Sequence, residues 1–491
     1  MKPDTLVATR TLYDGSAMLE KREASFRPAV TLDENTLLID PRTQHQPMLG
    51  FGGTWTDTDV YNLLRMSPEK QEEVLTALFD PEKGAGWNFM RLPFGSTDWE
   101  STYDFYTYDD VPRGEKDWEL AHFSIQRDID RGLFKLARRC KEINPEVIFL
   151  GSVWGVPGWM KNNDSIMYGI FDPQYTDVYA RYLRKTVQAY AEQGVDLYAV
   201  TPQNESLISE DRATPACRFT WRLQRDVILA LRKEFDAHGI TTQIWAFDDT
   251  FSKSPWFVTP LLADEAARKA LDGIAYHNYG GRVENMGEVA REFAMPVYMT
   301  ERCPHDVPAY IQMLEQLQNE ARSYISWTTL CNEYGGPHQG GDGKRPYSLF
   351  PRRGYYAFIT NKWETPDDWE KTPMYGLFAQ FSKYIRRGMR RVDCSPGCRG
   401  LDHGGSIHGR GDRGDGMHCR QRRGDSSELR APLRQPGSGD DSGAKIGRDM
   451  ALPAGGGDAA DICRTGKKTA QRTCLGYGGR RNHLAGRAKG R

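Results

Sequence analysis

Two glutamates of the sequence, Glu205 and Glu301, each stand where a short apolar run ends. The run at 197–201 leads within four residues to Asn204 and Glu205, and the run at 296–300 leads directly to Glu301. One such run fits a buried strand that delivers its terminal acid to a cleft, and it also fits an ordinary strand end with a glutamate in water. Two runs that both stop on a glutamate favour the cleft, because two such strand ends are much less easily explained by chance. Two carboxylates flanking one cleft are the arrangement that glycoside hydrolysis requires.

Eight strand-like runs alternate with amphipathic stretches of helical period, and these elements must position the two acids. The stretch at 175–193, for example, repeats apolar residues at the spacing of a helix packed on a sheet. This alternation predicts a (β/α)8 TIM barrel, in which the carboxyl ends of the strands carry the catalytic groups. An open doubly wound sheet is the alternative, because periodicity does not show closure. The predicted strands are 50–56, 88–94, 147–154, 197–201, 243–248, 273–279, 296–300 and 324–330.

The chain divides into three parts by composition. Residues 1–46 contain short alternating segments, which predict N-terminal strands of a side β-domain, and the catalytic barrel is expected over 47–393. Residues 394–491 hold 22 glycines, one aromatic residue, Tyr477, and no Trp, Phe or Val, so no strand or helix pattern is visible there. A nucleic-acid-binding extension and a disordered tail both fit this segment. The abrupt break in composition favours a third hypothesis, translation in the wrong reading frame.

Charge is distributed unevenly along the chain, although the net charge is only -1. Residues 394–491 hold 19 basic and 10 acidic side chains, whereas the preceding residues hold 46 basic and 56 acidic ones. An acidic body argues against nucleic acid as a partner, because neutralising phosphates requires a basic surface.

The cysteines and the N-terminus narrow the class of protein further. Cys140, Cys217, Cys303 and Cys331 are widely spaced, which predicts neither a disulfide framework nor a zinc site, and no metal or cofactor motif is found. Residues 1–24 lack the apolar core of a signal peptide, and no run reaches the length of a membrane span. We therefore expect a cytoplasmic protein, with secretion as the alternative if a signal peptide has been lost.

Several motifs, taken in their order and spacing over residues 48–393, resemble glycoside hydrolase family 30, the glucosylceramidase-like enzymes. The resemblance implies a (β/α)8 barrel with an attached β-sandwich, a carbohydrate or glycoside substrate, and no metal or other cofactor. Since the sequence after Asp393 does not supply the returning strands of the sandwich, we expect that sandwich to be incomplete. The motifs are GFGGTWTD at 50–57, RLPF at 91–94, WGVPGWMK at 154–161, QNE at 203–205, GIAYHNY at 273–279, TE at 300–301 and GGP at 335–337.

The resemblance also implies roles for single residues. Glu205 matches the general acid/base and Glu301 the nucleophile of a retaining double displacement. Arg91 matches an arginine beside the nucleophile, where a cation favours the charged carboxylate, with a structural salt bridge as the alternative. Asn204 is expected to bind the sugar 2-hydroxyl. His277 and Tyr279 match residues that line the family's cleft, with a satisfied core histidine as the alternative for His277, and Asp98 matches a sugar-binding position, with a turn or helix cap as its alternative. Trp154 and Trp327 suit stacking on a sugar, because apolar sugar faces pack on aromatic rings.

Asp248 and Asp249 are rivals for the catalytic pair, because they end the fifth predicted strand. Neighbouring side chains of a strand point to opposite sides, so at most one of these two faces the cleft. The function we expect is cleavage of β-glucosides, as in glucosylceramidases of sphingolipid and carbohydrate metabolism. A β-xylosidase or β-1,6-glucanase of the same family and a catalytically inactive glycan-binding protein are the alternatives.

Overall fold

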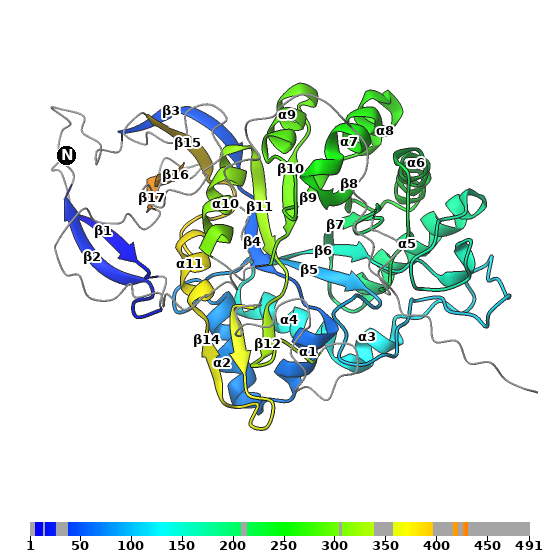
Figure 1. Ribbon diagram of the computed structural model, residues 1–491, viewed down its shortest axis with the longest axis horizontal. Helices are drawn as coiled ribbons and strands as arrows, with labels where there is room; N and C mark the ends of the chain where they lie inside the picture. The colour runs from blue at the N-terminus through cyan, green and yellow to red at the C-terminus, as the bar shows by residue number, and fades with distance from the viewer. Residues whose placement is uncertain are drawn as a thin grey trace, which may run out of the picture. The chain divides into compact units, whose positions relative to one another are not determined.

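The structure, a computed structural model, describes residues 5–12, 15–25, 38–207, 214–303, 307–337, 357–395, 416–420 and 426–430 (Figure 1). All of them fall in Met1–Arg434, the first of two units into which the chain divides. In this part of the chain, no helix has the length and apolar character needed to cross a membrane.

Eight parallel strands form the central sheet, in the order β4-β11-β10-β9-β8-β7-β6-β5 (Figure 1). The two end strands meet through a parallel bridge between Thr54 and Arg91, and the Trp55 N–H donates to the Arg91 carbonyl at 3.0 Å. The predicted TIM barrel is thus confirmed and the open sheet is excluded. The strands are β4 (Gly50–Gly53), β5 (Phe89–Phe94), β6 (Ile148–Val153), β7 (Leu197–Thr201), β8 (Gln243–Thr250), β9 (Gly273–His277), β10 (Val297–Glu301) and β11 (Ala321–Ser326).

The inside of the barrel has an apolar layer with a polar layer above it. Because strand side chains alternate, residues two positions apart face the same side. Arg91 accordingly follows the buried Phe89 into the interior, and His277 follows Ala275. The polar layer therefore lies toward the carboxyl ends of the strands, where TIM barrels carry their active sites. The apolar layer consists of Leu49, Phe89, Leu150, Ala199, Trp245, Ala275, Tyr298 and Ile325.

Helices α5 to α9 lie outside the strands that they connect (Figure 1). Ser67 caps the helix at 68–79 by accepting from the Lys70 N–H, and Pro68 takes the first helical position. The helices are α1 (Asp57–Leu64), α2 (Pro68–Phe79), α3 (Gln126–Arg131), α4 (Leu133–Ile143), α5 (Thr176–Glu192), α6 (Trp221–Ala237), α7 (Ser254–Ala263), α8 (Glu265–Ala270), α9 (Glu284–Phe293), α10 (Val307–Gln318) and α11 (Pro373–Ser382). Three short 3-10 helices are η1 (Gly158–Met160), η2 (Pro173–Tyr175) and η3 (Phe251–Lys253).

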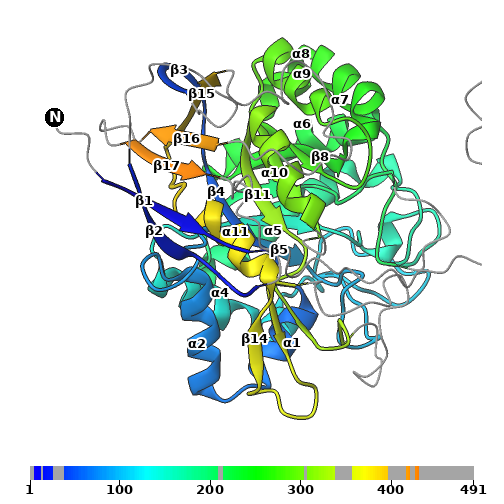
Figure 2. The same ribbon diagram turned by 60° about the vertical axis from the view of Figure 1, so that its left-hand side comes forward.

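Smaller sheets accompany the barrel. Strands β1 (Thr5–Arg10) and β2 (Glu20–Ser25) pair with each other, and β3 (Leu38–Pro47) pairs with β15 (Arg390–Ser395) in a four-stranded sheet (Figure 2). These antiparallel sheets agree with the side β-structure predicted from the N-terminal segments, whereas the domain limits at 46 and 393 stay predictions. A third sheet contains β12 (Leu330–Asn332), β13 (Ile359–Asn361) and β14 (Trp369–Lys371).

Two strands of the four-stranded sheet correct the prediction for the C-terminal segment. The sequence shows no strand pattern after Asp393, yet β16 (Gly416–Arg420) and β17 (Ser426–Arg430) follow β15 in the sheet. Main-chain hydrogen bonding along an open sheet edge needs no apolar stripe, so side-chain pattern alone missed these two strands. The reading-frame hypothesis stays a prediction, and the rest of 396–491 lies outside the described residues.

Candidate active site

A tight turn after β7 holds Glu205. The Asn204 N–H donates to the Val153 carbonyl of β6 at 2.7 Å, and the Glu205 N–H donates to the Asp248 carbonyl of β8 at 2.9 Å. Glu205 itself has a φ of 45°, a left-handed conformation that is uncommon outside glycine and costs about 1–3 kcal/mol. Main-chain hydrogen bonds to β6 and β8 therefore fix the turn that contains Glu205.

Arg91 connects the two strand ends that the sequence singled out. Its guanidinium is fully buried, and Nη1 donates to Glu301 Oε2 at the end of β10. Nη2 donates to Asn204 Oδ1 and to Asp248 Oδ2, both at 2.7 Å. The structure thus places Arg91 beside Glu301, as expected from the sequence, and the same side chain orients the amide next to Glu205.

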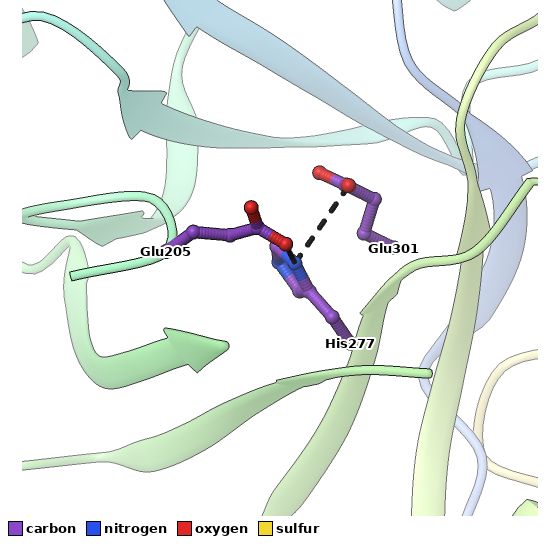
Figure 3. Close-up of side chains that lie close together, drawn as sticks. All are labelled: Glu205, His277 and Glu301. Carbon is purple, nitrogen blue, oxygen red and sulfur yellow. Dashed lines mark hydrogen bonds and ion pairs between the residues drawn. The ribbon is translucent and has the colours of Figure 1, made fainter. Parts of the chain in front are cut away.

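His277 lies between the two glutamates (Figure 3). Its Nδ1 is 3.2 Å from Glu205 Oε1 and 3.7 Å from Glu301 Oε1. One carboxylate oxygen of each glutamate and this nitrogen all lie within 4.8 Å of one another. Three side chains from the ends of β7, β9 and β10 therefore face one small space, in which a carboxyl group can donate a proton while the other acts as a nucleophile or base.

Asp248 is the buried anion that holds this cluster together. From the sequence it was expected only as a rival for the catalytic pair. It accepts from Arg91, and its Oδ1 lies 3.0 Å from His277 Nε2. The hydroxyls of Thr201 and Thr300 each donate to it at 2.7 Å. Burial opposes its ionisation, but the charges of Arg91 and His277 keep the pKa of Asp248 well below the usual range.

An irregularity in strand pairing decides which of the two aspartates enters the cluster. The register between β8 and β9 shifts between Phe247 and Asp249, so the strict alternation that would turn residue 247 inward is broken. Asp248 faces the barrel interior, whereas Asp249 accepts from Lys253 Nζ at 2.8 Å. The terminal aspartate pair was visible in the sequence, but the bulge that selects Asp248 was not.

Charges inside the cluster set its protonation. Burial alone would lower the pKa of His277, but the charge of Glu301 and the contacts with Asp248 and Glu205 raise it to about 10. His277 is therefore positively charged at neutral pH. Burial raises the pKa of Glu301 above its usual range; the charges of His277 and Arg91 oppose this rise, and Glu205 adds to it.

The aromatic residues expected to bind sugar lie around this cluster. Trp154 and Trp327 stack on each other with ring centroids 5.1 Å apart, and the Arg91 guanidinium lies 4.4 Å from the Trp154 ring centroid. Each indole is only 4% exposed, so each presents little surface to a ligand. Tyr279 is 43% exposed, and its hydroxyl lies 3.4 Å from Cys303 Sγ.

Asp98 lies near Cys303, at the edge of the site. It is half-buried, and its charge contributes, after burial, to raising the pKa of the Cys303 thiol to about 12. The structure thus brings Arg91, Asn204, His277 and the two glutamates into direct contact and places the remaining predicted residues around them.

Replacing Asp248 with asparagine is expected to lower kcat about 100-fold, because Arg91 and His277 lose the charge that orients them. Breaking a buried ion pair should also lower the free energy of unfolding by about 3 kcal/mol. Since Asp248 helps to raise the pKa of His277, the imidazole should lose its positive charge at lower pH in this variant. The alkaline limb of the pH–kcat profile should therefore move to lower pH. Steady-state kinetics over pH and thermal unfolding measure these effects.

The matched control is Asp226→Asn, whose carboxylate pairs with Arg225 on α6. This variant should keep the position of the alkaline limb. A wild-type pH profile in Asp248→Asn would contradict the orienting role of Asp248.

Comparisons with known proteins place this geometry in context. The model of the glycosyl hydrolase family 30 TIM-barrel domain matches residues 48–303. An endo-1,6-beta-D-glucanase of Trichoderma harzianum is 28% identical over 372 residues, which cover 70% of this chain and 70% of that protein. Lysosomal acid glucosylceramidase of Mus musculus is 26% identical over 394 residues, which cover 72% of this chain and 71% of that protein. A solved endo-beta-1,6-glucanase has the same fold, with a TM-score of 0.71 and 24% identity over 86% of this chain and 90% of its own.

Proposed function

The chain belongs to glycosyl hydrolase family 30 and is a glycoside hydrolase, and from this premise we propose that it cleaves β-glucosides by a retaining double displacement. The observation that carries the proposal is the short distance between the two acids, since one oxygen of Glu205 and one of Glu301 lie within 4.8 Å. Retaining enzymes hold their carboxyl groups about 5–5.5 Å apart, whereas inverting enzymes leave about 6.5–9.5 Å for a water molecule.

The contacts of the two acids support different roles. Glu301 accepts from Arg91, which stabilises its charged form, and its side chain is only 7% exposed, which suits a nucleophile shielded from water. Glu205 instead lies 3.2 Å from His277 Nδ1, and its side chain is 17% exposed. Glu205 is therefore the better placed to meet both a leaving group and a water molecule.

In the first step, Glu301 attacks the anomeric carbon as Glu205 gives its proton to the glycosidic oxygen, and the bond between that carbon and oxygen breaks. In the second step, Glu205 takes a proton from water, the water oxygen attacks the anomeric carbon, and Glu301 leaves as a carboxylate. Asn204, held by Arg91 at 2.7 Å, is placed to hydrogen-bond the sugar beside the nucleophile.

The relatives support glucose as the sugar on the nonreducing side of the cleaved bond. Both a glucosylceramidase and an endo-1,6-beta-D-glucanase, by their names, act on bonds formed by a glucose unit. The two relatives are 28% and 26% identical to this chain, so β-1,6-glucan is kept as a candidate substrate beside glucosylceramide.

Proton NMR of the first product tests the mechanism. Hydrolysis of an aryl β-glucoside should release β-glucose, which then mutarotates toward the α-anomer. Release of α-glucose first would contradict a retaining displacement.

A substrate panel tests the specificity. Rates on glucosylceramide, β-1,6-glucan and an aryl β-xyloside, compared with the aryl β-glucoside, distinguish the candidate substrates. Hydrolysis of none of them, together with retained sugar binding, would instead indicate a glycan-binding protein.

A further inference from the structure

His277 turns one ring nitrogen toward two carboxylate oxygens. Nδ1 lies 3.2 Å from Glu205 Oε1 and 3.7 Å from Glu301 Oε1, and the three side chains offer one ligand atom each within a 4.8 Å span (Figure 3). These spacings suit an ion about 2.0–2.2 Å from each atom after small side-chain rotations. Because the three residues come from three different strands, no spacing in the sequence could have revealed this group.

In the group of Glu205, His277 and Glu301, two further polar atoms are held by other partners. Arg91 donates to Glu301 Oε2, so Oε1 is the oxygen turned toward His277. Asp248 Oδ1 lies 3.0 Å from His277 Nε2, on the opposite side of the ring from the glutamates. A carboxylate on the far nitrogen of an imidazole is the arrangement that orients a metal-binding histidine and strengthens it as a ligand.

We propose that Glu205, His277 and Glu301 bind a divalent transition-metal ion of the Zn²⁺ class, and that the bound ion inhibits the enzyme reversibly. One imidazole nitrogen with two carboxylate oxygens suits such an ion, whereas Mg²⁺ and Ca²⁺ prefer oxygen ligands throughout. The charges around the space also favour a cation, since Glu205, Glu301 and Asp248 outnumber Arg91 and His277 when all are ionised.

The inhibitory part of this inference rests on the proposed function, whereas metal binding does not. An ion on Glu301 Oε1 occupies the atom that would attack the anomeric carbon, and its contact with Glu205 removes the proton donor. The ion would also fill the space needed by the sugar ring, so inhibition should be competitive with substrate. Because a ligating nitrogen must be free of its proton, the ion displaces the proton of Nδ1 on binding.

Calorimetric titration of the metal-free full-length protein with Zn²⁺ tests binding without any need for activity. We expect one site that an iminosugar competes for, a higher Tm with the ion bound, and loss of the site in His277→Gln. Mg²⁺ and Ca²⁺ at the same concentrations should leave Tm unchanged. If His277→Gln does not fold, competition by the iminosugar in the unsubstituted protein decides the question. Zn²⁺ binding unaffected by both the variant and the iminosugar would overturn the proposal.

Cys303 supplies the matched control, because its thiol lies near Tyr279 at the edge of the same site and could itself bind a soft cation. The Cys303→Ser variant should keep the Zn²⁺ site, and its loss there would assign the ion to the thiol and overturn the proposal. In kinetics, Zn²⁺ at ten times its Kd should raise KM about tenfold without changing kcat, with reversal by a chelator. Zn²⁺ binding in a protein that hydrolyses no glycoside would refute the proposed function while leaving the metal site intact.

Discussion

The variant Glu301→Gly is expected to hydrolyse an aryl β-glucoside with kcat lowered roughly 10⁵-fold or more, because the covalent intermediate can no longer form. The fold should survive, since Glu301 is the last residue of β10 and its backbone stays paired with β9. Loss of the carboxylate leaves Arg91 with Asp248 as its remaining ionic partner in the described cluster. Steady-state rates, with circular dichroism as the check on folding, measure the effect.

Azide should restore turnover in Glu301→Gly, because the small anion can enter the space left by the carboxylate and attack the anomeric carbon from that side. The expected product is an α-glycosyl azide, identified by NMR. A β-glycosyl azide would instead reverse the assignment of acid and nucleophile. Glu234→Gln is the matched control: Glu234 of α6 pairs with Arg184 of α5, and its replacement should leave kcat unchanged.

Replacing Glu205 with alanine should separate the two steps of the reaction. Substrates with a poor leaving group need its proton, so kcat/KM for an alkyl β-glucoside should fall about 10²- to 10⁴-fold. Dinitrophenolate leaves without protonation, so a dinitrophenyl β-glucoside should keep most of its kcat/KM. The second step still lacks its base, so the glycosyl-enzyme accumulates and the released phenol appears as a burst.

Azide added to Glu205→Ala should react with that glycosyl-enzyme and give a β-glycosyl azide, the opposite anomer from the Glu301 variant. Stopped-flow absorbance measures the burst, and NMR identifies the azide. Equal losses of kcat/KM for both leaving groups would contradict the role of Glu205 as acid. The acid limb of the pH profile should move to lower pH, because Glu205 no longer helps to raise the pKa of Glu301.

Much of the barrel could be predicted from the sequence because its signals are local. Burial on both sides makes each barrel strand a short apolar run, and helices packed outside repeat apolar residues every three or four positions. Each of the eight predicted runs overlaps a strand, although β11 begins at Ala321, ahead of the predicted start at 324. Strand ends in a TIM barrel carry the site, so Glu205 and Glu301 were visible as candidates from position alone.

The roles of single residues were less visible from pattern. Arg91 and His277 were chosen only through the family resemblance, although both follow an interior apolar residue by two positions on their strands. That spacing could have marked them as facing the interior, but a buried arginine or histidine is more commonly a satisfied structural group. The strands β16 and β17 were missed because their side chains carry no alternating pattern.

The sequence by itself thus determined which strands form and which side chains stand at their ends, because burial and alternation act along the chain. Only the tertiary structure decided how those ends meet. Closure between β4 and β5 brings Arg91 to Glu301, the register shift in β8 turns Asp248 inward, and a left-handed turn aims Glu205 at His277. These arrangements depend on contacts between strands far apart in sequence, and such contacts leave no periodic signal in any one of them.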